Sequence, residues 1–288
     1  MKMKSSNIKE GVARFIFMTS AAASIFAVAL ICTFLFANGV PAMMEIGLPD
    51  FLFGHTWRPA NDIYGIFPMI IGSLYVTAGA IIVGVPIGIA CAIFLSHFSS
   101  GRVSRWLKGG VDLLAGIPSV VYGFFGLVVM VPFIRTTMPG QGLSLLAAAV
   151  LLGIMILPTI ITVAKNALDS VPRKYYEGAA ALGANHERCV FNVIVPAATS
   201  GIMAGVVLGV GRAIGETMAV IMVAGNQTII PDSIFDGVRT MTANIVLEMS
   251  YAADLHRGAL IATGVVLFVF VMLITLLFNM IKKRGEVH

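Results

Sequence analysis

Six long stretches with few or no charged side chains are the feature that most limits what this chain can fold into. About 20 consecutive apolar residues cross the hydrocarbon core of a bilayer as one α-helix. Stretches of this kind lie at about 15–37, 69–95, 113–134, 143–164, 198–224 and 258–281. Only 11% of the 288 residues are charged, whereas about a quarter are charged in a typical soluble domain. We therefore expect an all-α polytopic membrane protein with six transmembrane helices, and a soluble fold is excluded.

The Lys and Arg residues indicate how the chain crosses the membrane. Fourteen of the 19 lie in the N-terminus, the second and fourth loops and the C-terminus, and four (Arg58, Arg135, Arg239 and Arg257) lie in the other loops. Cytoplasmic loops carry the excess of positive charge, so both termini are expected in the cytoplasm. Residues 1–14 would form a cytoplasmic N-terminus and residues 15–288 a single transmembrane domain. The net charge of +5 reflects this bias, and nucleic-acid binding has no support.

Two long loops are expected on the external side. The first, about 38–68, contains Trp57 and Tyr64, which we interpret either as an interfacial aromatic anchor or as a docking surface for an extracytoplasmic partner. The second, about 225–257, has an apolar centre at 240–249 that we expect to re-enter the membrane or to lie on it.

The internal loop 165–196 has the pattern of two short helices joined at an angle. Asp169 or Ser170 can cap the first helix, and Pro172 suits its first turn. Gly183 can end that helix in the left-handed conformation. Asn185 can then cap a second helix that ends before Pro196. The two helices would form a ledge beneath the membrane bundle.

This loop resembles the EAA signature of ABC-importer permeases, which reads E-A-A, three residues, G, nine residues, I-x-L-P. Glu177, Gly178 and Ala179 stand at the triplet, Gly183 follows at the same distance, and 193–196 read Val-Ile-Val-Pro. The resemblance implies a type I importer permease fold in which 165–196 couples the bundle to an ATPase. Glu177, Gly178, Ala179, Ala180, Gly183 and Pro196 would then be the coupling residues. The chain lacks a phosphate-cradling G-x-x-x-x-G-K-[ST] loop, so the ATPase is expected to be a separate polypeptide, and the chain itself not an enzyme.

A charged pair interrupts the fifth stretch. Burying an ionised side chain at the centre of a bilayer costs roughly 2.5–3.5 kcal/mol on insertion scales, so two such residues need a reason. Arg212 and Glu216 stand four residues apart and would share a helix face, where they can pair. They form either an internal clamp that fixes the bundle or an anion site on a translocation path, since guanidinium suits bidentate contact with phosphate.

Two further stretches look like signatures of phosphate-specific permeases. They are 114–123, Leu-Ala-Gly-Ile-Pro-Ser-Val-Val-Tyr-Gly, and 211–220, Gly-Arg-Ala-Ile-Gly-Glu-Thr-Met-Ala-Val. Both resemble the C-type subunit (PstC) more than the A-type. The resemblance implies transport residues at Arg212, Glu216, Ser119 and Thr217, in the inner (plasma) membrane of a bacterium. It also implies a heterodimer with an A-type permease subunit, two copies of a cytoplasmic ATP-binding subunit, and an extracytoplasmic phosphate-binding protein.

Two rival functions stay open. A permease for another oxyanion or an organic solute would have the same coupling loop. An ion-coupled secondary transporter could use Arg212 and Glu216 as a proton relay, but that leaves the spacing of 177–196 unexplained. No metal or cofactor is expected, because His, Cys, Asp and Glu show no ligand spacing.

Overall fold

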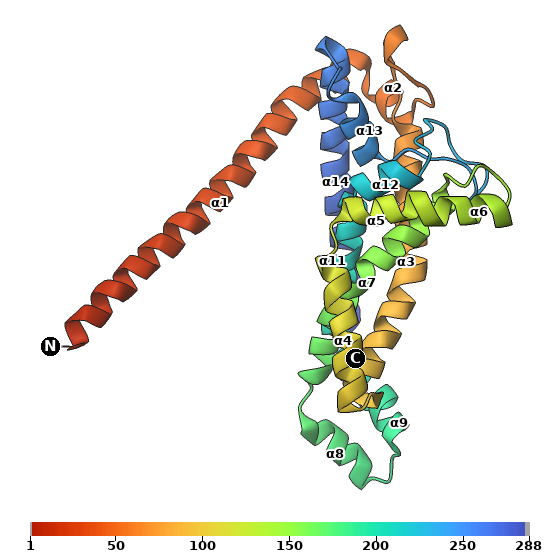
Figure 1. Ribbon diagram of the computed structural model, residues 1–288. Helices are drawn as coiled ribbons and strands as arrows, with labels where there is room; N and C mark the ends of the chain where they lie inside the picture. The colour runs from red at the N-terminus through yellow and green to blue at the C-terminus, as the bar shows by residue number, and fades with distance from the viewer. Residues whose placement is uncertain (1, 286–288) are drawn as a thin grey trace.

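The computed structural model describes residues 2–285, and it is predominantly helical (Figure 1). Met1 and residues 286–288, at the two predicted cytoplasmic ends, lie outside the described residues. In chain order the α-helices are α1 (Lys2–Ile46), α2 (Leu48–Phe53), α3 (Phe67–Ile93), α4 (Gly101–Gly116), α5 (Ser119–Phe125), α6 (Val131–Thr137), α7 (Leu145–Asp169), α8 (Arg173–Ala181), α9 (His186–Cys189), α10 (Val195–Ala197), α11 (Thr199–Gly215), α12 (Met218–Val223), α13 (Met241–Glu248) and α14 (Asp254–Gly285).

Shorter elements join or extend these helices. Strands β1 (Trp57–Arg58) and β2 (Ile63–Tyr64) form an antiparallel hairpin in which Trp57 pairs with Tyr64. One 3₁₀ turn covers Pro59–Asn61, and π-helical segments cover Phe94–Phe98, Gly126–Met130 and Val190–Ile194.

The apolar helices agree with the predicted membrane fold. Helical segments at Glu10–Ile46, Phe67–Phe98, Ser119–Thr137, Leu145–Asp169 and Asp254–Phe278 are each long and apolar enough to cross a bilayer. A bent pair, His186–Ala197 and Thr199–Gly215, meets the same criterion together and turns by 67° between its halves. Six spans result when the bent pair is counted as one.

The predicted third span, 113–134, begins too early. Helix α4 ends at Gly116, and Ile117 is extended (φ −73°, ψ 125°) before α5 starts at Ser119. Pro118 explains the break, because proline disfavours the helical conformation of the residue before it and has no backbone N–H to donate. The apolar run to Thr137 is therefore a helix separate from α4.

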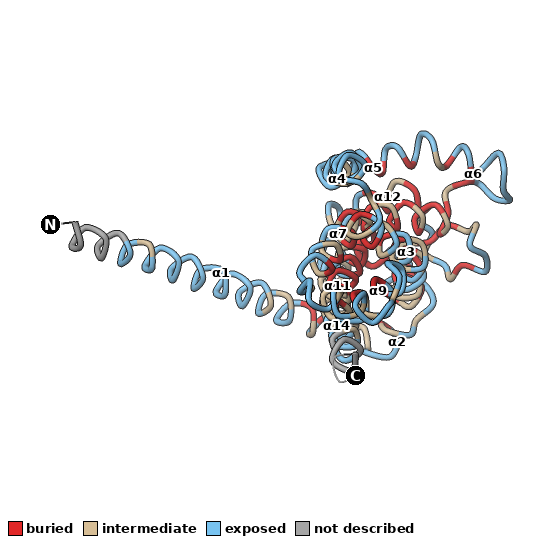
Figure 2. Tube along the Cα trace, turned by 90° about the horizontal axis from the view of Figure 1, so that it is seen from below, coloured by how far each residue is buried: buried red, intermediate tan, exposed pale blue. Residues whose placement is uncertain are grey.

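Helix α7 forms the centre of the bundle, with α3 and α11 packed against it. Small residues allow this close approach. A Cβ at Gly84 of α3 would lie 2.7 Å from the carbonyl oxygen of Gly153, and one at Gly209 of α11 would lie 2.8 Å from Ile160 Cγ1. Figure 2 shows the buried residues gathered around α3, α7 and α12.

Helix α1 leaves the bundle along most of its length (Figure 1). Its C-terminal third packs on α14, where Phe36 meets Phe268 edge to face and Gly39 approaches Val265. The apolar residues before that contact are largely exposed within this chain. The helix also continues to Ile46, nine residues past the predicted end of the first span.

The two ends of the bundle carry different structures. Helices α8 and α9 protrude at one end, while α2, α13 and the β1–β2 hairpin lie at the other (Figure 1). Helix α13 occupies the apolar centre of the predicted second external loop. It packs against α3 and α14, with Met241, Ala243 and Asn244 buried. Much of the segment 240–249 is therefore part of the protein core, and its apolar character is explained by this packing; the expectation that it re-enters the membrane or lies on it stays a prediction.

Candidate functional site

Arg212 lies in the last turn of α11, on the side that faces α7. Its Nη1 donates a hydrogen bond to Thr159 Oγ1 at 3.4 Å, which is long for such a bond. In the described part of the chain, no carboxylate oxygen lies within 4.0 Å of its guanidinium nitrogens. The half-buried guanidinium therefore has N–H donors that residues 2–285 leave without an acceptor.

The predicted ion pair between Arg212 and Glu216 does not form in the structure. Helix α11 ends at Gly215, and Glu216 is extended with ψ 132°, so the two residues do not share a helix face. The Glu216 carboxylate instead accepts hydrogen bonds from the backbone N–H groups of Thr217 and Ala219, at 3.1 and 3.2 Å. It caps the start of α12, because the first N–H groups of a helix have no partner within the helix.

The two family-like stretches meet where α5 packs on α12. A Cβ at Gly123 would lie 2.9 Å from the Cα of Ala219, so the two helices touch with almost no side chain between them. Tyr122 is buried, and its hydroxyl donates to the Leu114 carbonyl across the Pro118 break at 2.9 Å. The two breaks, one before Ser119 and one at Glu216–Thr217, thus lie at the starts of two helices that are in contact.

Ser119 and Thr217 occupy these two breaks. Ser119 is the first residue of α5 and is half-buried. Thr217 precedes α12, and its hydroxyl donates to the Gly215 carbonyl at 3.2 Å. Space remains beside them, because a Cβ at Gly116, Gly211 or Gly215 would have no neighbour within 4 Å.

The ledge formed by α8 and α9 confirms most of the predicted local structure. Gly183 is left-handed (φ +85°), and Asn185 caps α9 by accepting from the backbone N–H of Arg188 at 2.9 Å. Asp169 is instead the last residue of α7 and pairs with Lys165 at 2.5 Å. Pro196 lies inside α10, which continues from α9 through the π-helical segment, so the second helix does not end before it.

The coupling residues predicted on the ledge face solvent in this chain. Glu177, Gly178 and Ala180 are exposed on α8, which has no buried residue. Leu182, just after α8, is 91% exposed.

The ledge is anchored to the end of α3. The ring of His186 lies between Tyr176 Oη, 3.0 Å from its Nδ1, and the His97 carbonyl, 3.0 Å from its Nε2. Phe98 meets the same ring edge to face at 5.0 Å between centroids. Ser96 adds a hydrogen bond to Asp169. The ledge is therefore connected to the α3 end by side-chain contacts as well as along the chain.

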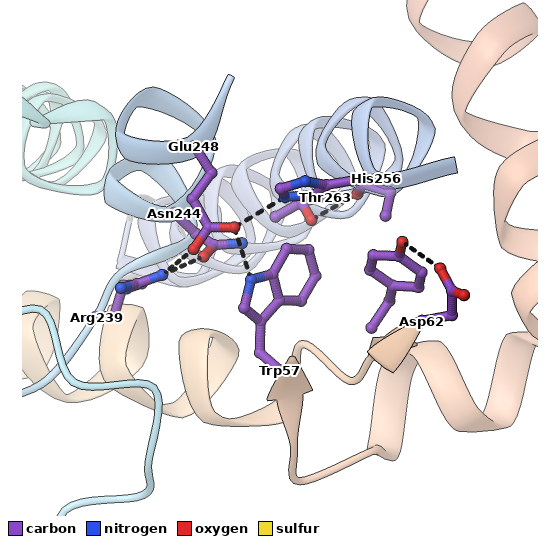
Figure 3. Close-up of polar contacts among 9 residues, drawn as sticks. Trp57, Asp62, Arg239, Asn244, Glu248, His256 and Thr263 are labelled. Carbon is purple, nitrogen blue, oxygen red and sulfur yellow. Dashed lines mark hydrogen bonds and ion pairs between the residues drawn. The ribbon is translucent and has the colours of Figure 1, made fainter. Parts of the chain in front are cut away.

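A buried charged cluster centred on Glu248 lies at the opposite end of the molecule (Figure 3). The sequence did not predict it. The Glu248 side chain is 8% exposed and pairs with Arg239 Nη1 at 2.5 Å. Trp57 Nε1 donates to the other carboxylate oxygen, Glu248 Oε2, at 2.9 Å, and His256 Nε2 also lies 2.9 Å from Oε2. Trp57 is thus buried rather than an interfacial anchor, so that interpretation was wrong. The one sequence feature that could have indicated this cluster is Glu248 itself, the single carboxylate in the otherwise uncharged segment 240–249.

A cavity of about 550 Å³ opens beside this cluster, next to Glu248 and His256. Tyr64 lies on its wall and donates to Asp62 at 3.1 Å. Burial raises the pKa of Tyr64, and the bond to the Asp62 carboxylate raises that pKa further. The phenol therefore stays neutral at physiological pH and remains a hydrogen-bond donor.

Comparisons with known proteins agree with this architecture. Residues 84–286 match the family described as "Binding-protein-dependent transport system inner membrane component". The chain is 39% identical to a probable ABC transporter permease protein, YqgH, of Bacillus subtilis, over 95% of this chain and 91% of that protein. It is 38% identical to the phosphate transport system permease protein PstC of Mesorhizobium japonicum, over 83% of this chain and 80% of that protein.

Solved structures show the same fold at low sequence identity. An inward-facing MetNI methionine ABC transporter matches with a TM-score of 0.61 and 21% identity, over 80% of this chain and 99% of that one. A bacterial ABC transporter that imports alginate matches with a TM-score of 0.64 and 14% identity, over 92% and 94%. The fold is that of a type I ABC importer permease, and the chain belongs to the binding-protein-dependent transport system inner membrane component family, in which it is similar over most of its length to the PstC permeases.

Proposed function

We propose that this chain is the permease subunit of an ATP-driven importer of inorganic phosphate, and that Arg212 contacts the anion during translocation. The observation that supports this most is that the Arg212 guanidinium is half-buried yet has N–H donors without an acceptor among the described residues. The guanidinium belongs to an apolar helix, has one long hydrogen bond to Thr159, and lies where Gly211 and Gly215 leave space. A guanidinium with unused donors in partly desolvated surroundings suits a phosphate oxyanion.

Relatives support phosphate as the substrate. Several proteins named as phosphate transport system permease PstC are 30–38% identical over 80% or more of this chain. Both stretches that resemble phosphate-specific permeases lie at the α5–α12 contact, close to the end of α11. Ser119, at the first break, would donate its hydroxyl to the same anion, and Thr217 would do so after releasing its bond to the Gly215 carbonyl. Glu216 would fix the break that separates α12 from Arg212.

The proposed complex contains this chain and an A-type permease subunit, which together enclose the pathway. Of the two ATP-binding subunits, one would dock on the ledge of this chain, with Ala179 and Ala180 allowing close approach and Glu177 offering a carboxylate at the edge of the contact. An extracytoplasmic phosphate-binding protein would deliver the anion at the Glu248 end. Both termini would lie in the cytoplasm, because the Lys and Arg residues concentrate in the two termini and in the second and fourth loops, which lie on the same side.

The experiment that tests this function is phosphate uptake by the Arg212→Gln variant in the purified, reconstituted complex. We expect uptake to be abolished while the complex still assembles, because glutamine keeps a polar side chain that can donate hydrogen bonds but lacks the charge and the guanidinium group. Arg14→Gln is the matched control, since Arg14 is an exposed arginine on α1, outside both the proposed site and the Glu248 end, and it should transport normally. Normal uptake by Arg212→Gln would overturn the site.

The same assay separates the rival functions. Competition by sulfate or another oxyanion for wild-type uptake would identify a permease of different specificity. Uptake that persists without ATP and stops with a protonophore would identify an ion-coupled secondary transporter.

A further inference from the structure

Glu248 is a buried carboxylate on which three distant parts of the chain converge. Trp57 comes from the external hairpin, Arg239 precedes α13, and His256 lies in the first turns of α14 (Figure 3). Burying an ion costs several kcal/mol even after relaxation. Replacing a whole buried ion pair by well-packed apolar side chains is often neutral or stabilising, so stability alone is a weak reason for the Glu248–Arg239 pair.

The bonds to Glu248 fix the C-terminal end of α13. Arg239 also donates to Asn244 Oδ1 and to the Asn226 carbonyl, both at 3.0 Å. The guanidinium therefore joins the residues before α13, the helix itself and the loop that follows α12. Asn244 is fully buried beside it.

The N-terminal end of α13 is attached to the proposed transport site. Thr242 Oγ1 donates to the Glu216 carbonyl at 3.2 Å. The backbone N–H of Met241 donates to Ser73 Oγ on α3 at 2.9 Å. An eight-residue helix is about 12 Å long, so α13 is a short rigid element with Glu248 at one end and the Glu216 break at the other.

We propose that Glu248 is a positioning residue for transport: by fixing α13, its carboxylate sets the position of the Glu216 break, and hence the space beside Arg212, through the hydroxyl of Thr242. The inference rests on the proposed function, because it concerns the same site. Glu248, at the external end, would thus keep the transport site in position without contacting the anion.

The test is a double-mutant cycle with Glu248→Gln and Thr242→Val in the complete reconstituted complex with its phosphate-binding protein. Both single variants should lower the maximal rate of phosphate uptake roughly three-fold or more, as expected for residues between coupled sites. The concentration of binding protein at half-maximal uptake should not change. The double variant should be no slower than the slower single variant, because both substitutions interrupt one connection.

Thr263→Val is the matched control. Thr263 is buried in α14 near the cluster, and its hydroxyl donates only to the Ala259 carbonyl of its own helix, at 2.9 Å. This variant should transport like the wild type, and its effect should add to that of Glu248→Gln. If Glu248→Gln does not assemble, Trp57→Phe removes one donor to Glu248 and should show the same fall in maximal rate and the same non-additivity with Thr242→Val.

Two outcomes would overturn the inference. Additive losses from Glu248→Gln and Thr242→Val would show that the two residues act separately. A raised half-maximal concentration of binding protein with an unchanged maximal rate would place Glu248 in docking instead. Failure of the proposed function gives a different result, since the wild-type complex would then take up no phosphate.

Discussion

The carboxylate of Glu216 accepts a hydrogen bond from the backbone N–H of Ala219 at 3.2 Å, and so this acidic side chain caps a helix. The partner of this carboxylate is the α12 backbone rather than the guanidinium four residues earlier. This geometry separates two properties of Glu216, its charge and its acceptor oxygen, which substitutions can test one at a time.

Glu216→Gln should preserve the stability of the complex, because the amide oxygen can still accept from Ala219. Glu216→Ala should lower stability by about 1 kcal/mol, the usual cost of losing an N-cap. Thermal unfolding of the purified complex measures the difference. If uptake falls in Glu216→Gln while the melting temperature is unchanged, the charge itself serves transport; equal losses of stability in both variants would contradict the capping role.

Arg212→Lys should retain a positive charge but lose bidentate contact with the anion, because an ammonium is a point charge without the planar fork. We expect the phosphate concentration at half-maximal uptake to rise by about ten-fold, equivalent to ~1.4 kcal/mol. Kinetics of labelled phosphate uptake measure it. Wild-type kinetics in Arg212→Lys would indicate that only charge matters at this position.

Gly183→Val should strain the turn between α8 and α9. The residue has φ +85°, and a non-glycine residue in that conformation costs roughly 1–2 kcal/mol. Relief of the strain would change the angle of the ledge, so ATP hydrolysis should continue with reduced uptake, or the ATPase should fail to co-purify. Gly109→Ala, at an open helical position of α4, is the control and should behave like the wild type. Unchanged coupling in Gly183→Val would show that the ledge is only a connector.

His186→Leu should loosen the ledge from α3. Leucine keeps the apolar contact with Phe98 but loses both ring-nitrogen contacts, to Tyr176 and to the His97 carbonyl. The ratio of phosphate moved to ATP hydrolysed should fall. His55→Leu is the matched control, because His55 also lies 5.0 Å from a phenylalanine ring, that of Phe67, at the opposite end of the molecule. Equal ratios in the two variants would remove α3 from the coupling route.

The sequence predicted the helical membrane fold and the ledge because both depend on local rules. Apolar length determines a span, and a glycine between an alanine-rich run and Asn185 determines a turn. Gly183 and Asn185 have the conformation and the bond expected of them. The family-like spacing of 177–196 then located the protruding helices.

The helix breaks and the Glu248 cluster could not be predicted in the same way. A continuous helix would place Arg212 and Glu216 on one face. The helix ends at Gly215 instead, and the Glu216 carboxylate accepts hydrogen bonds from backbone N–H groups at the start of α12. Trp57 and Glu248 are 191 residues apart in the sequence, and no local pattern indicates such a pair. The apolar character of α13 was ambiguous, since core and membrane surroundings select the same side chains.

The breaks between α4 and α5 and between α11 and α12 are two points where the bundle should bend more easily than within a continuous helix. A line through the two breaks divides the bundle. At Ile117 and at Glu216 the backbone is already extended, so a change of angle there breaks few helical hydrogen bonds. Above this line α5 and α12 are joined by glycine contact; below it α4 and α11 both continue toward the ledge (Figure 1). A push on the ledge would thus tilt the lower segments at these two breaks, while the α5–α12 pair moves as one block.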